Sequence, residues 1–379
     1  MHRLSACRLT GREDDKGEGK GPRASAIAVI ERWLTETAGW LPEAGRPEEE
    51  LFERFLADGG AVTVECRRSR ADDCRLDEYL LRESDGTAQR RTVFRISSDG
   101  TATEVYVELF AACEPDEPTA GRRLAKELYC PGAVRLLIEE REWLLGEMPL
   151  PARPLRFATE RDGVRLARIV EHPTRQLPLI LVSLLDGHGP SEGFAAELAS
   201  ELAGVAAVME VEEAATWGLT QTLGKHWSCF GGAVRLFWPR PTDEHPLRHP
   251  LWIAARPGEG DYERERAVRA LHARLVRQTM YGASAAFAES RLLAEVRARV
   301  REARLERFVK SREETWAALW HELARENAGL RHALADRDNE LAELRLIATV
   351  NDEFVSGDAS TSVGHEPRSA DRPKATRAH

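Results

Sequence analysis

The chain has 379 residues, of which 42% are hydrophobic and 31% are charged, a composition that supports two or three domains with substantial cores. A formal net charge of −9 at pH 7 argues against non-specific nucleic-acid binding by the whole molecule. The longest apolar run, 179–185, is far shorter than the ~18–20 residues of a membrane span, so we expect no membrane partner. Acidic residues at 13–15 stand where a secretory signal would have its apolar segment, which favours a cytoplasmic protein.

The cysteines and histidines show no metal-binding pattern. None of the six cysteines has the CxxC spacing of a structural zinc site, and their scatter argues against a disulfide framework. His245 and His249 are spaced as in a metalloprotease helix, but Pro246 and Pro250 disfavour a helix there. We therefore expect free thiols, no metal site and no cofactor.

The N-terminal region is expected to be helical after a disordered start. Residues 1–24 are rich in glycine and charge without periodicity, which is typical of a disordered tail. Apolar residues in 25–41 and 48–58 recur with helical spacing and predict two helices. Gly59 and Gly60 are expected to end the second helix.

The pattern then changes to a period of two, which predicts an antiparallel meander. The strand-like runs, separated in part by Asp-Gly turn signals, are 61–66, 79–82, 91–96 and 103–110. A helix is predicted at 120–129, and a hairpin around Asp162 and Gly163 at 157–170. Residues 25–170 are therefore expected to form an α+β module that contains this meander.

The clearest unit in the sequence is 171–260, where short apolar strands alternate with helices. Its three strand-like runs are 179–185, 205–211 and 232–238. The helix between the first two is expected to begin with Ser191 as its N-cap, and a second helix spans 212–223. This order is typical of a βαβαβ unit with a parallel, Rossmann-like sheet.

The C-terminal region, 261–348, is expected to be helical and to contain a coiled coil. A helix is predicted at 261–280, and after Ser284 no residue stops a further helix before about Ile347. Residues 349–379 contain Gly, Ser, Thr and Pro without a period, which is typical of a disordered tail.

A leucine-rich seam is the strongest signal in this region. Heptad a and d positions between Trp316 and Ala348 are apolar except for Asn327 and Arg337. A stripe that repeats every 3.5 residues is buried only against another helix, and Asn at an a position pairs with its own copy in a parallel, in-register homodimer. The predicted dimer interface consists of Trp316, Trp320, Leu323, Asn327, Leu330, Leu334, Leu341 and Leu344.

Charges beside this seam agree with parallel pairing. Glu326 at a g position would face Arg331 of the other chain, and Glu340 would face Arg345 in the same way. Exposed pairs of this kind add only ~0.2–1 kcal/mol each. Two alternatives stay open, because Arg337 interrupts a seam of only about four heptads. The helix folds back on its own globular domain, or it pairs with a different protein.

Arginines are frequent just upstream of the seam, between 291 and 312. A basic helix that leads into a leucine seam resembles a basic-zipper DNA reader. Glu295 and Glu302 interrupt the basic run, and Val296 and Val300 indicate an apolar stripe that a DNA-reading helix would not need. A solvated charged face is therefore the favoured interpretation, and nucleic-acid contact is the less favoured one.

The loop after the first strand of the central unit is the candidate ligand site, because ligands of open parallel sheets bind at the carboxyl ends of strands. Gly187, Gly189 and Gly193 come within one residue of a dinucleotide-binding fingerprint. Glu192 in the first helical turn would repel a phosphate, and Pro190 lacks an amide donor. The alternative interpretation is a tight turn that needs glycine for its dihedral angles.

Four residues in and after this loop are candidate catalytic residues: Asp186, His188, Ser191 and Cys229. Ser191 lies in a G-x-S-x-G sequence between a strand and a helix, although three residues separate the strand from the first glycine. His188 follows an apolar strand as in caspase-like cysteine peptidases, but Cys229 precedes a strand where that family has it after one. Ser191 as a helix cap and Cys229 as a buried thiol are the structural alternatives.

One stretch carries a resemblance to other proteins. The sequence GGAVRLFWP at 231–239, with 202–204 and 223–224 before it and 249–252 after it, resembles a segment of uncharacterised bacterial proteins. The similarity covers about 178–345 and is specific only in GGAVRLFWP. In such proteins a β-rich part precedes an α/β unit, a charged coiled coil follows, and the genes occur among phage-defence genes. The resemblance implies partner proteins and implies no catalytic role.

The sequence therefore predicts an α/β protein with an N-terminal antiparallel β-rich module, a central βαβαβ unit and a long C-terminal coiled-coil helix. The predicted function is that of a non-catalytic scaffold or accessory subunit, a homodimer that binds other proteins of an antiviral defence system. The alternative is a hydrolase or nucleotide-binding enzyme that uses the loop Asp186–Gly193.

Overall fold

The computed structural model of the chain contains two compact units, Met1–Arg312 and Glu313–His379. The helix predicted at 120–129 and the tail predicted at 349–379 lie outside the described residues. Within the described part of the chain, no helix is long and apolar enough to cross a membrane. The structure describes residues 2–12, 21–57, 59–85, 88–113, 130–239, 245–253, 261–286, 290–310 and 322–342.

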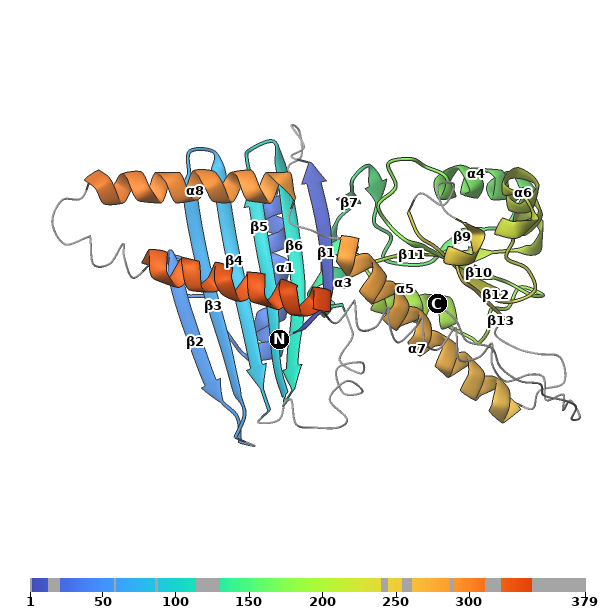
Figure 1. Cartoon of the computed structure of the whole chain (residues 1–379), viewed down its shortest axis with the longest axis horizontal. Helices are drawn as coiled ribbons and strands as arrows, with labels where there is room; N and C mark the ends of the chain where they lie inside the picture. The colour runs from blue at the N-terminus through green and yellow to red at the C-terminus, as the bar shows by residue number, and fades with distance from the viewer. Residues whose placement is uncertain are drawn as a thin grey trace, which may run out of the picture. The chain divides into compact units, whose positions relative to one another are not determined.

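The larger sheet of the first unit is antiparallel, with the strand order β2-β3-β4-β5-β6-β1-β7-β8 (Figure 1). The meander expected at 61–110 is present as β3 to β6, which pair in chain order. The strands are β1 (His2–Arg12), β2 (Glu49–Phe55), β3 (Ala61–Ala71), β4 (Cys74–Ser84), β5 (Ala88–Ser98), β6 (Ala102–Cys113), β7 (Leu144–Leu145) and β8 (Met148–Pro149).

Two predictions for the N-terminal region are wrong. Residues 2–12 are not a disordered tail but strand β1, which pairs with β6 and buries Leu4 and Leu9 in the core. Residues 49–55 form strand β2 and not a helix, because β2 pairs with β3 along its whole length. This pairing leaves Leu51 and Phe55 69% and 76% exposed, so the helical spacing of the apolar residues does not reflect a buried face.

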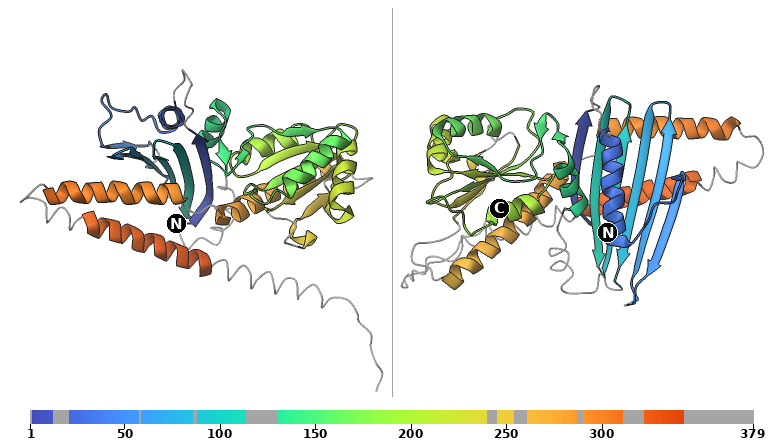
Figure 2. Two further views of the ribbon diagram at one scale, coloured as in Figure 1. Left: turned by 90° about the horizontal axis from the view of Figure 1, so that it is seen from above. Right: turned by 180° about the vertical axis from the view of Figure 1, so that it is seen from behind.

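Two helices lie on opposite faces of this sheet, as the view in Figure 2 (left) shows. Helix α1 (Pro22–Ala38) buries Ile30 and Leu34 and ends at Gly39, whose φ of 74° is a left-handed C-cap. Helix α8 (Arg291–Lys310) buries Leu293 and Val296 in a separate apolar cluster on the other face. Successive side chains of a strand point to opposite faces of the sheet, so the same strands pack against both helices.

The smaller sheet is mixed and has the order β13-β12-β10-β11-β9. Its strands are β9 (Leu155–Phe157), β10 (Leu179–Ser183), β11 (Ala207–Val211), β12 (Ala233–Phe237) and β13 (Leu251–Ile253). The other helical elements of the unit are α3 (Gly132–Glu140), α4 (Glu160–Val170), α5 (Phe194–Glu201), α6 (Glu213–Leu223), η1 (Lys225–Trp227), η3 (Pro246–Arg248) and α7 (Asp261–Ala286).

The prediction of a parallel, Rossmann-like βαβαβ unit is wrong. Strands β9, β10 and β11 are parallel, but β12 runs antiparallel to β10 and β13 runs antiparallel to β12. After α6, η1 and the residues to Gly232 lead into β12, which begins beside the carboxyl end of β10, where Val234 pairs with Val182. The pattern could not reveal this, because a fully buried strand has the same apolar composition in either direction.

The hairpin predicted at 157–170 is also wrong, since most of this range is helix α4. The Thr159 side chain caps the helix in a reciprocal capping box with Asp162. Asp-Gly signals a turn in many sequences, but Gly163 serves another purpose. An added Cβ there would lie 2.0 Å from the carbonyl oxygen of Ala215, so glycine permits α4 and α6 to approach closely.

One long coiled-coil helix from Ser284 to about Ile347 is not present, so this part of the predicted fold is wrong. Helices α7 and α8 are separate, and the helix at 322–342 belongs to the second unit. The Ser290 hydroxyl caps α8 by accepting a hydrogen bond from the Leu293 amide at 3.1 Å. The apolar stripe of α8 then packs on the larger sheet and not on a partner helix.

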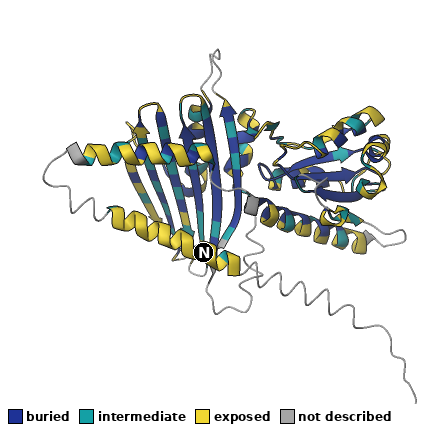
Figure 3. Ribbon diagram, turned by 45° about the horizontal axis from the view of Figure 1, so that its top comes forward, coloured by how far each residue is buried: buried dark blue, intermediate teal, exposed yellow. Residues whose placement is uncertain are grey.

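A single hydrophobic core joins the two sheets of the first unit. The cluster includes buried residues from β1 and β5 of the larger sheet, from β10 and β11 of the smaller sheet, and from α7. Figure 3 shows the buried residues concentrated on the strands of both sheets. Leu275 of α7 is fully buried in this cluster. Strand β10, which the candidate ligand loop follows, is therefore packed in this shared core.

Candidate functional site

The loop after β10 begins with a two-residue hairpin turn. Leu185 and His188 exchange backbone hydrogen bonds of 2.8 and 2.9 Å. The residues between them, Asp186 and Gly187, have φ angles of 52° and 80°, as a type I′ turn requires. Gly187 thus has a backbone role in the turn, and the side chains of Asp186 and His188 are exposed.

Ser191 does not cap the next helix, so this prediction is wrong. Helix α5 begins at Phe194, and its N-cap residue is Gly193, with a φ of 73° and no side-chain cap. Ser191 is exposed, and only its carbonyl oxygen contacts the helix start, accepting from the Phe194 amide at 3.3 Å. Gly193 therefore also has a conformational role, since a left-handed residue at this point turns the chain into α5.

Cys229 lies in a different environment from this loop. Its side chain is 1% exposed, and its thiol donates to the carbonyl oxygen of Ala233 at 3.3 Å. Burial raises the pKa of the Cys229 thiol to about 12, so the nucleophilic thiolate is scarcely populated at neutral pH. The contacts of the Cys229 thiol are to backbone carbonyl oxygens, and His188 is exposed, so the two residues do not form a Cys/His hydrogen-bonded pair in this structure.

The carboxyl edge of the parallel strands is acidic. Helices α4 and α6 begin there, with Glu160 and Asp162 in the first turn of α4 and Glu213 in that of α6. Glu212, the N-cap residue of α6, is paired with Arg156 at 2.7 Å. Carboxylates at helix N-termini disfavour a bound phosphate, so this edge does not resemble a nucleotide phosphate site.

Arg235 of the GGAVRLFWP stretch lies in a cluster of rings to which Phe237 of the stretch and Trp227 and His249 outside it contribute. Its guanidinium group lies 5.5 Å from the Trp227 ring centroid and 5.2 Å from that of Phe237, and it donates to the Ser228 carbonyl at 2.9 Å. His249 is buried beside these rings, and its Nδ1 accepts a hydrogen bond from the backbone amide of Trp238. This cluster packs β12 against η1 and against the residue that follows η3.

The two histidines with ligand-like spacing have structural roles. His249 accepts the hydrogen bond just described, and Nδ1 of His245 accepts from the Leu247 amide at 3.3 Å at the start of η3. Among the residues that the structure describes, no group of three or more His, Cys, Asp or Glu side chains is arranged to hold a metal ion.

Arg175 is a buried residue that sequence reasoning missed. It is 2% exposed, and its guanidinium group donates to the carbonyl oxygens of four residues at 2.7 to 3.3 Å. Burial lowers its pKa to about 10, which still leaves it charged at neutral pH. The short polar run around it in the sequence gives no signal of burial. The four acceptors belong to Val170, Leu177, Phe237 and Trp238.

A buried ionic network beneath α1 was missed as well. The Tyr79 hydroxyl on β4 donates to Glu31 of α1 at 2.9 Å. Arg68 on β3 lies 3.3 Å from Glu31 and 3.6 Å from Glu50, which also accepts from the Trp40 indole at 2.8 Å. Burial raises the pKa of the Tyr79 hydroxyl, which stays protonated as a donor. The network joins α1 to β2, β3 and β4, so its role is structural.

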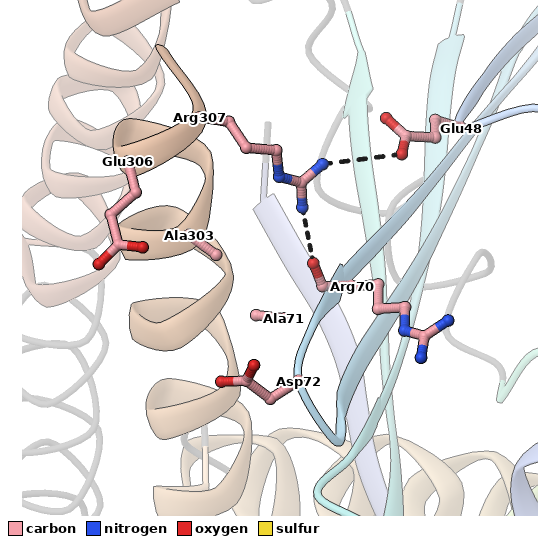
Figure 4. Close-up of a pocket in the computed structure, with 7 residues that line it drawn as sticks. All are labelled: Glu48, Arg70, Ala71, Asp72, Ala303, Glu306 and Arg307. Carbon is pink, nitrogen blue, oxygen red and sulfur yellow. Dashed lines mark hydrogen bonds and ion pairs between the residues drawn. The ribbon is translucent and has the colours of Figure 1, made fainter. Parts of the chain in front are cut away.

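A cavity of about 470 Å³ lies between the end of β3 and the last turns of α8 (Figure 4). Arg307 crosses it and donates to the Arg70 carbonyl at 2.8 Å, with Glu48 at 3.9 Å. Acidic and basic side chains both line the cavity, so its charge favours neither an anion nor a cation. The lining residues are Glu48, Arg70, Ala71, Asp72, Ala303, Glu306 and Arg307.

The helix at 322–342 carries part of the predicted dimer interface. Its leucines at heptad a and d positions are exposed, and Asn327 between them is exposed too. Trp316, Trp320 and Leu344 of the predicted interface lie outside the described residues. The exposed leucines and their exposed fractions are Leu323 (39%), Leu330 (55%), Leu334 (63%) and Leu341 (53%).

Comparison of the chain with protein-family models, with curated proteins and with solved structures found no match.

Proposed function

We propose that this protein is a non-catalytic scaffold or accessory subunit that forms a homodimer through the helix at 322–342. The exposed leucine row on this helix carries the proposal. Burial of a leucine side chain is worth ~1.5–3 kcal/mol, so a partner that covers the row gains several such contributions. The segment is shorter than the long coiled coil that the sequence suggested, and the proposed pairing spans about three heptads.

A second copy of this chain suits the row because the row is complementary to itself in parallel register. Asn327 takes an a position, where it pairs with its own copy across the seam. Glu326 takes a g position and faces Arg331 at e of the other chain, which places opposite charges together. Arg337 at a d position weakens the seam, so we expect a dissociation constant in the micromolar range.

The role in a multi-component system is part of the same proposal. The stretch 231–239 resembles proteins that occur among phage-defence genes, and in the structure it forms β12 and its ring cluster. These contacts are packing contacts, which supports a scaffold more than a reaction. We therefore propose that the folded unit presents surfaces to other cytoplasmic proteins while the helix at 322–342 pairs two copies.

The alternative proposal is a hydrolase or nucleotide-binding enzyme centred on Asp186–Gly193. Gly187 and Gly193 have backbone roles in this loop, Ser191 is exposed, and Cys229 is buried as a thiol. Acidic residues at the helix N-termini beside the loop disfavour a phosphate. These placements favour the scaffold over the enzyme.

Light scattering on the full chain tests the dimer. Wild type should show a mass of twice 42.4 kDa at micromolar concentration. The double variant Leu330→Asp/Leu334→Asp places charges in the seam and should show the mass of one chain. A matched control, Ala328→Asp/Ala335→Asp, adds the same charges at b positions on the outer side and should stay dimeric. A single-chain mass for wild type would refute the dimer.

A charge exchange tests the parallel register separately. Glu326→Lys places Lys opposite Arg331 and should raise the dissociation constant several-fold, because like charges then meet at g and e. Glu326→Lys/Arg331→Glu restores opposite charges and should recover most of the affinity. An equal loss of affinity in the single and double variants would argue against this register.

A further inference from the structure

The smaller sheet ends in a strand whose outer edge has no neighbouring strand among the described residues. This strand is β13, the first in the order β13-β12-β10-β11-β9 (Figure 1). The Leu236 amide donates to the Pro250 carbonyl, so these two residues face each other as a hydrogen-bonded pair of the antiparallel ladder. Because bonded and non-bonded pairs alternate, the backbone groups of Trp252 face β12, and those of Leu251 and Ile253 point outward.

The side chains at this edge are apolar and exposed. Leu251 is 47% exposed and Ile253 is 72% exposed, and both lie on one face of the sheet because alternate residues of a strand do. On the opposite face, Trp252 is half-buried, and the Arg274 guanidinium group of α7 lies 5.9 Å from its ring centroid. The strand is therefore held from one face, and a partner that binds its edge meets a preformed surface.

The apolar surface continues from β13 towards α6. Ile253 pairs with Ala233, whose amide donates to the Phe230 carbonyl at 3.1 Å. The Phe230 ring lies 4.9 Å from the ring of Trp217 on α6, which is 52% exposed. Contiguous exposed apolar side chains of this kind mark binding surfaces. We call this surface the β13 patch, and it consists of Trp217, Phe230, Leu251 and Ile253.

The two ends of the β13 patch carry opposite charges. Ile253 lies at the end where β10 finishes, and the exposed carboxylates of Asp186 and Glu213 border that end. Lys225 and Arg248 are exposed on η1 and η3, beside the end of β12. A segment that lies along β13 therefore meets complementary charges when its basic end is beside Ile253.

The aromatic rings of the β13 patch favour a cation at the same end. The rings of Trp217 and Phe230 are inclined to each other by 58°. Glu213 precedes Trp217 by four residues, which places both on one face of α6. Aromatic rings with a carboxylate beside them attract a lysine or arginine side chain by cation–π and charge interactions.

We propose that the β13 patch binds an extended peptide of another protein, which joins the smaller sheet as a strand antiparallel to β13. Alternate apolar side chains of the peptide cover Leu251 and Ile253, and a basic residue near its amino end reaches Trp217 and Glu213. Backbone hydrogen bonds at the edge give affinity, and the apolar and basic side chains give specificity. The inference rests on the proposed scaffold role, in which the first unit binds another protein, and not on the homodimer.

Fluorescence anisotropy with a synthetic peptide tests the site. In the probe, four valines alternate with threonines and two lysines precede them; in the control peptide, two glutamates replace the lysines. The full wild-type chain should bind the probe saturably and the control peptide at least about tenfold more weakly. No saturable binding of the probe below about 1 mM, or equal affinity for the two peptides, would overturn the proposal.

The same titration separates this site from the proposed dimer. The double variant Leu330→Asp/Leu334→Asp, which is designed to separate the two copies, should bind the probe as wild type does. The dimer can therefore fail while the peptide site holds, and the reverse. A change in the mass of the peptide-free chain on substitution of Ile253 by proline would show that a second copy covers β13, and would contradict the proposal.

Substitutions at two sheet edges locate the bound peptide. Ile253→Pro removes an outward amide and no hydrogen bond to β12, so the sheet should remain folded while the affinity falls at least about tenfold. Leu251→Ser/Ile253→Ser should weaken binding in the same direction. The matched control is Leu51→Ser/Phe55→Ser, which changes two exposed apolar residues on β2, an edge strand of the larger sheet, and should leave the affinity unchanged. Weaker binding in the β2 variant alone would refute the site.

Hydrogen exchange distinguishes strand addition from a contact between side chains. With the probe bound, the amides of Leu251 and Ile253 should exchange more slowly, because they then donate to the peptide. The amides of β2 should keep their exchange rates. Saturable binding without added protection at 251–253 would show that the peptide does not join the sheet, and the proposal would be wrong.

Discussion

At the scale of single residues, the buried charge of Arg175 links α4, β10 and β12 by hydrogen bonds. Its guanidinium group donates to carbonyls at the end of α4, before β10 and after β12. Arg175→Met keeps the aliphatic stem but leaves these acceptors without their donors. Because unsatisfied buried acceptors cost about 1–3 kcal/mol each, we expect the free energy of unfolding to fall by about 3–5 kcal/mol in urea titrations.

The matched control for this substitution is Arg161→Met. Arg161 is an exposed arginine on α4, close to Arg175 in the sequence. Its replacement should change the free energy of unfolding by no more than about 0.5 kcal/mol, as is usual for surface positions. Equal effects of the two substitutions would show that the buried hydrogen bonds of Arg175 contribute little.

At the scale of elements, two glycines determine how closely α4 and α6 pack. An added Cβ at Gly163 would lie 2.0 Å from the Ala215 carbonyl oxygen, and one at Gly218 would lie 2.1 Å from that of Glu160. Alanine gains up to about 1 kcal/mol over glycine within a helix, but here it must push two backbones apart. Gly163→Ala or Gly218→Ala should therefore lower the free energy of unfolding by about 2–3 kcal/mol.

Gly329→Ala is the control for these glycines. It lies in the helix at 322–342, and an added Cβ there meets no atom within 4 Å. We expect this variant to raise helix stability, measured by circular dichroism, and to leave the unfolding of the first unit unchanged. If Gly163→Ala also left the first unit unchanged, the close approach of α4 and α6 would be refuted.

The capping box of α4 predicts that its contribution to the free energy of unfolding depends on pH. Hydrogen bonds from the Thr159 side chain and backbone lower the pKa of the Asp162 carboxyl below its usual value of 3.8. A group whose pKa is lower in the folded state contributes stability above its unfolded pKa and loses it as the pH falls through the folded pKa. Thr159→Ala should therefore lower the free energy of unfolding at neutral pH, and the difference from wild type should shrink as the pH falls through the folded pKa of Asp162.

Chemical denaturation at a series of pH values measures this difference. Thr222→Ala on α6 is the control, because the Thr222 hydroxyl donates to the Gly218 carbonyl and not to a carboxylate. Its effect on the free energy of unfolding should not depend on pH below 5 or so. A Thr159→Ala difference that stayed constant down to the acid transition would show that the Asp162 carboxylate contributes nothing to the cap.

The same elements show what the sequence could predict and why it failed elsewhere. The apolar runs predict the positions of β10, β11 and β12 correctly, because a strand that is buried on both faces is apolar at nearly every position. Their directions were not predictable, since direction depends on the path of the connections. The Asp-Gly pair at 162–163 predicts a turn from local sequence, but glycine is needed there because of α6, a helix that is distant in the sequence.

In the candidate site, too, roles that depend on local sequence could be predicted, and roles that depend on distant partners could not. The turn interpretation of Gly187 could be made from the sequence, because the Asp-Gly signal for a type I′ turn is local. The sequence predicts Ser191 as a helix N-cap, but Gly193 turns the chain first, and the helix begins only at Phe194. The roles of Arg175 and of the network around Glu31 depend on distant partners, so no local pattern could reveal them.

At the scale of the whole molecule, the shared core predicts that the two sheets of the first unit unfold together. The core cluster contains residues of β1 and β5, of β10 and β11, and of α7 between them. Arg8 of β1 also donates to Gln176, just before β10, at 2.6 Å. Because one apolar cluster stabilises both sheets, removing part of it should weaken both by the same amount.

Leu275→Ala tests this cooperativity, since Leu275 of α7 is fully buried in the shared core. The substitution should lower the free energy of unfolding by about 2–5 kcal/mol. Hydrogen exchange measured by mass spectrometry should show β5 and β10 losing protection at the same denaturant concentration, shifted equally from wild type. Leu305→Ala on α8, where Leu305 is 39% exposed, should shift neither strand appreciably. Loss of protection in β10 at a denaturant concentration that leaves β5 protected would mean that each sheet folds on its own core.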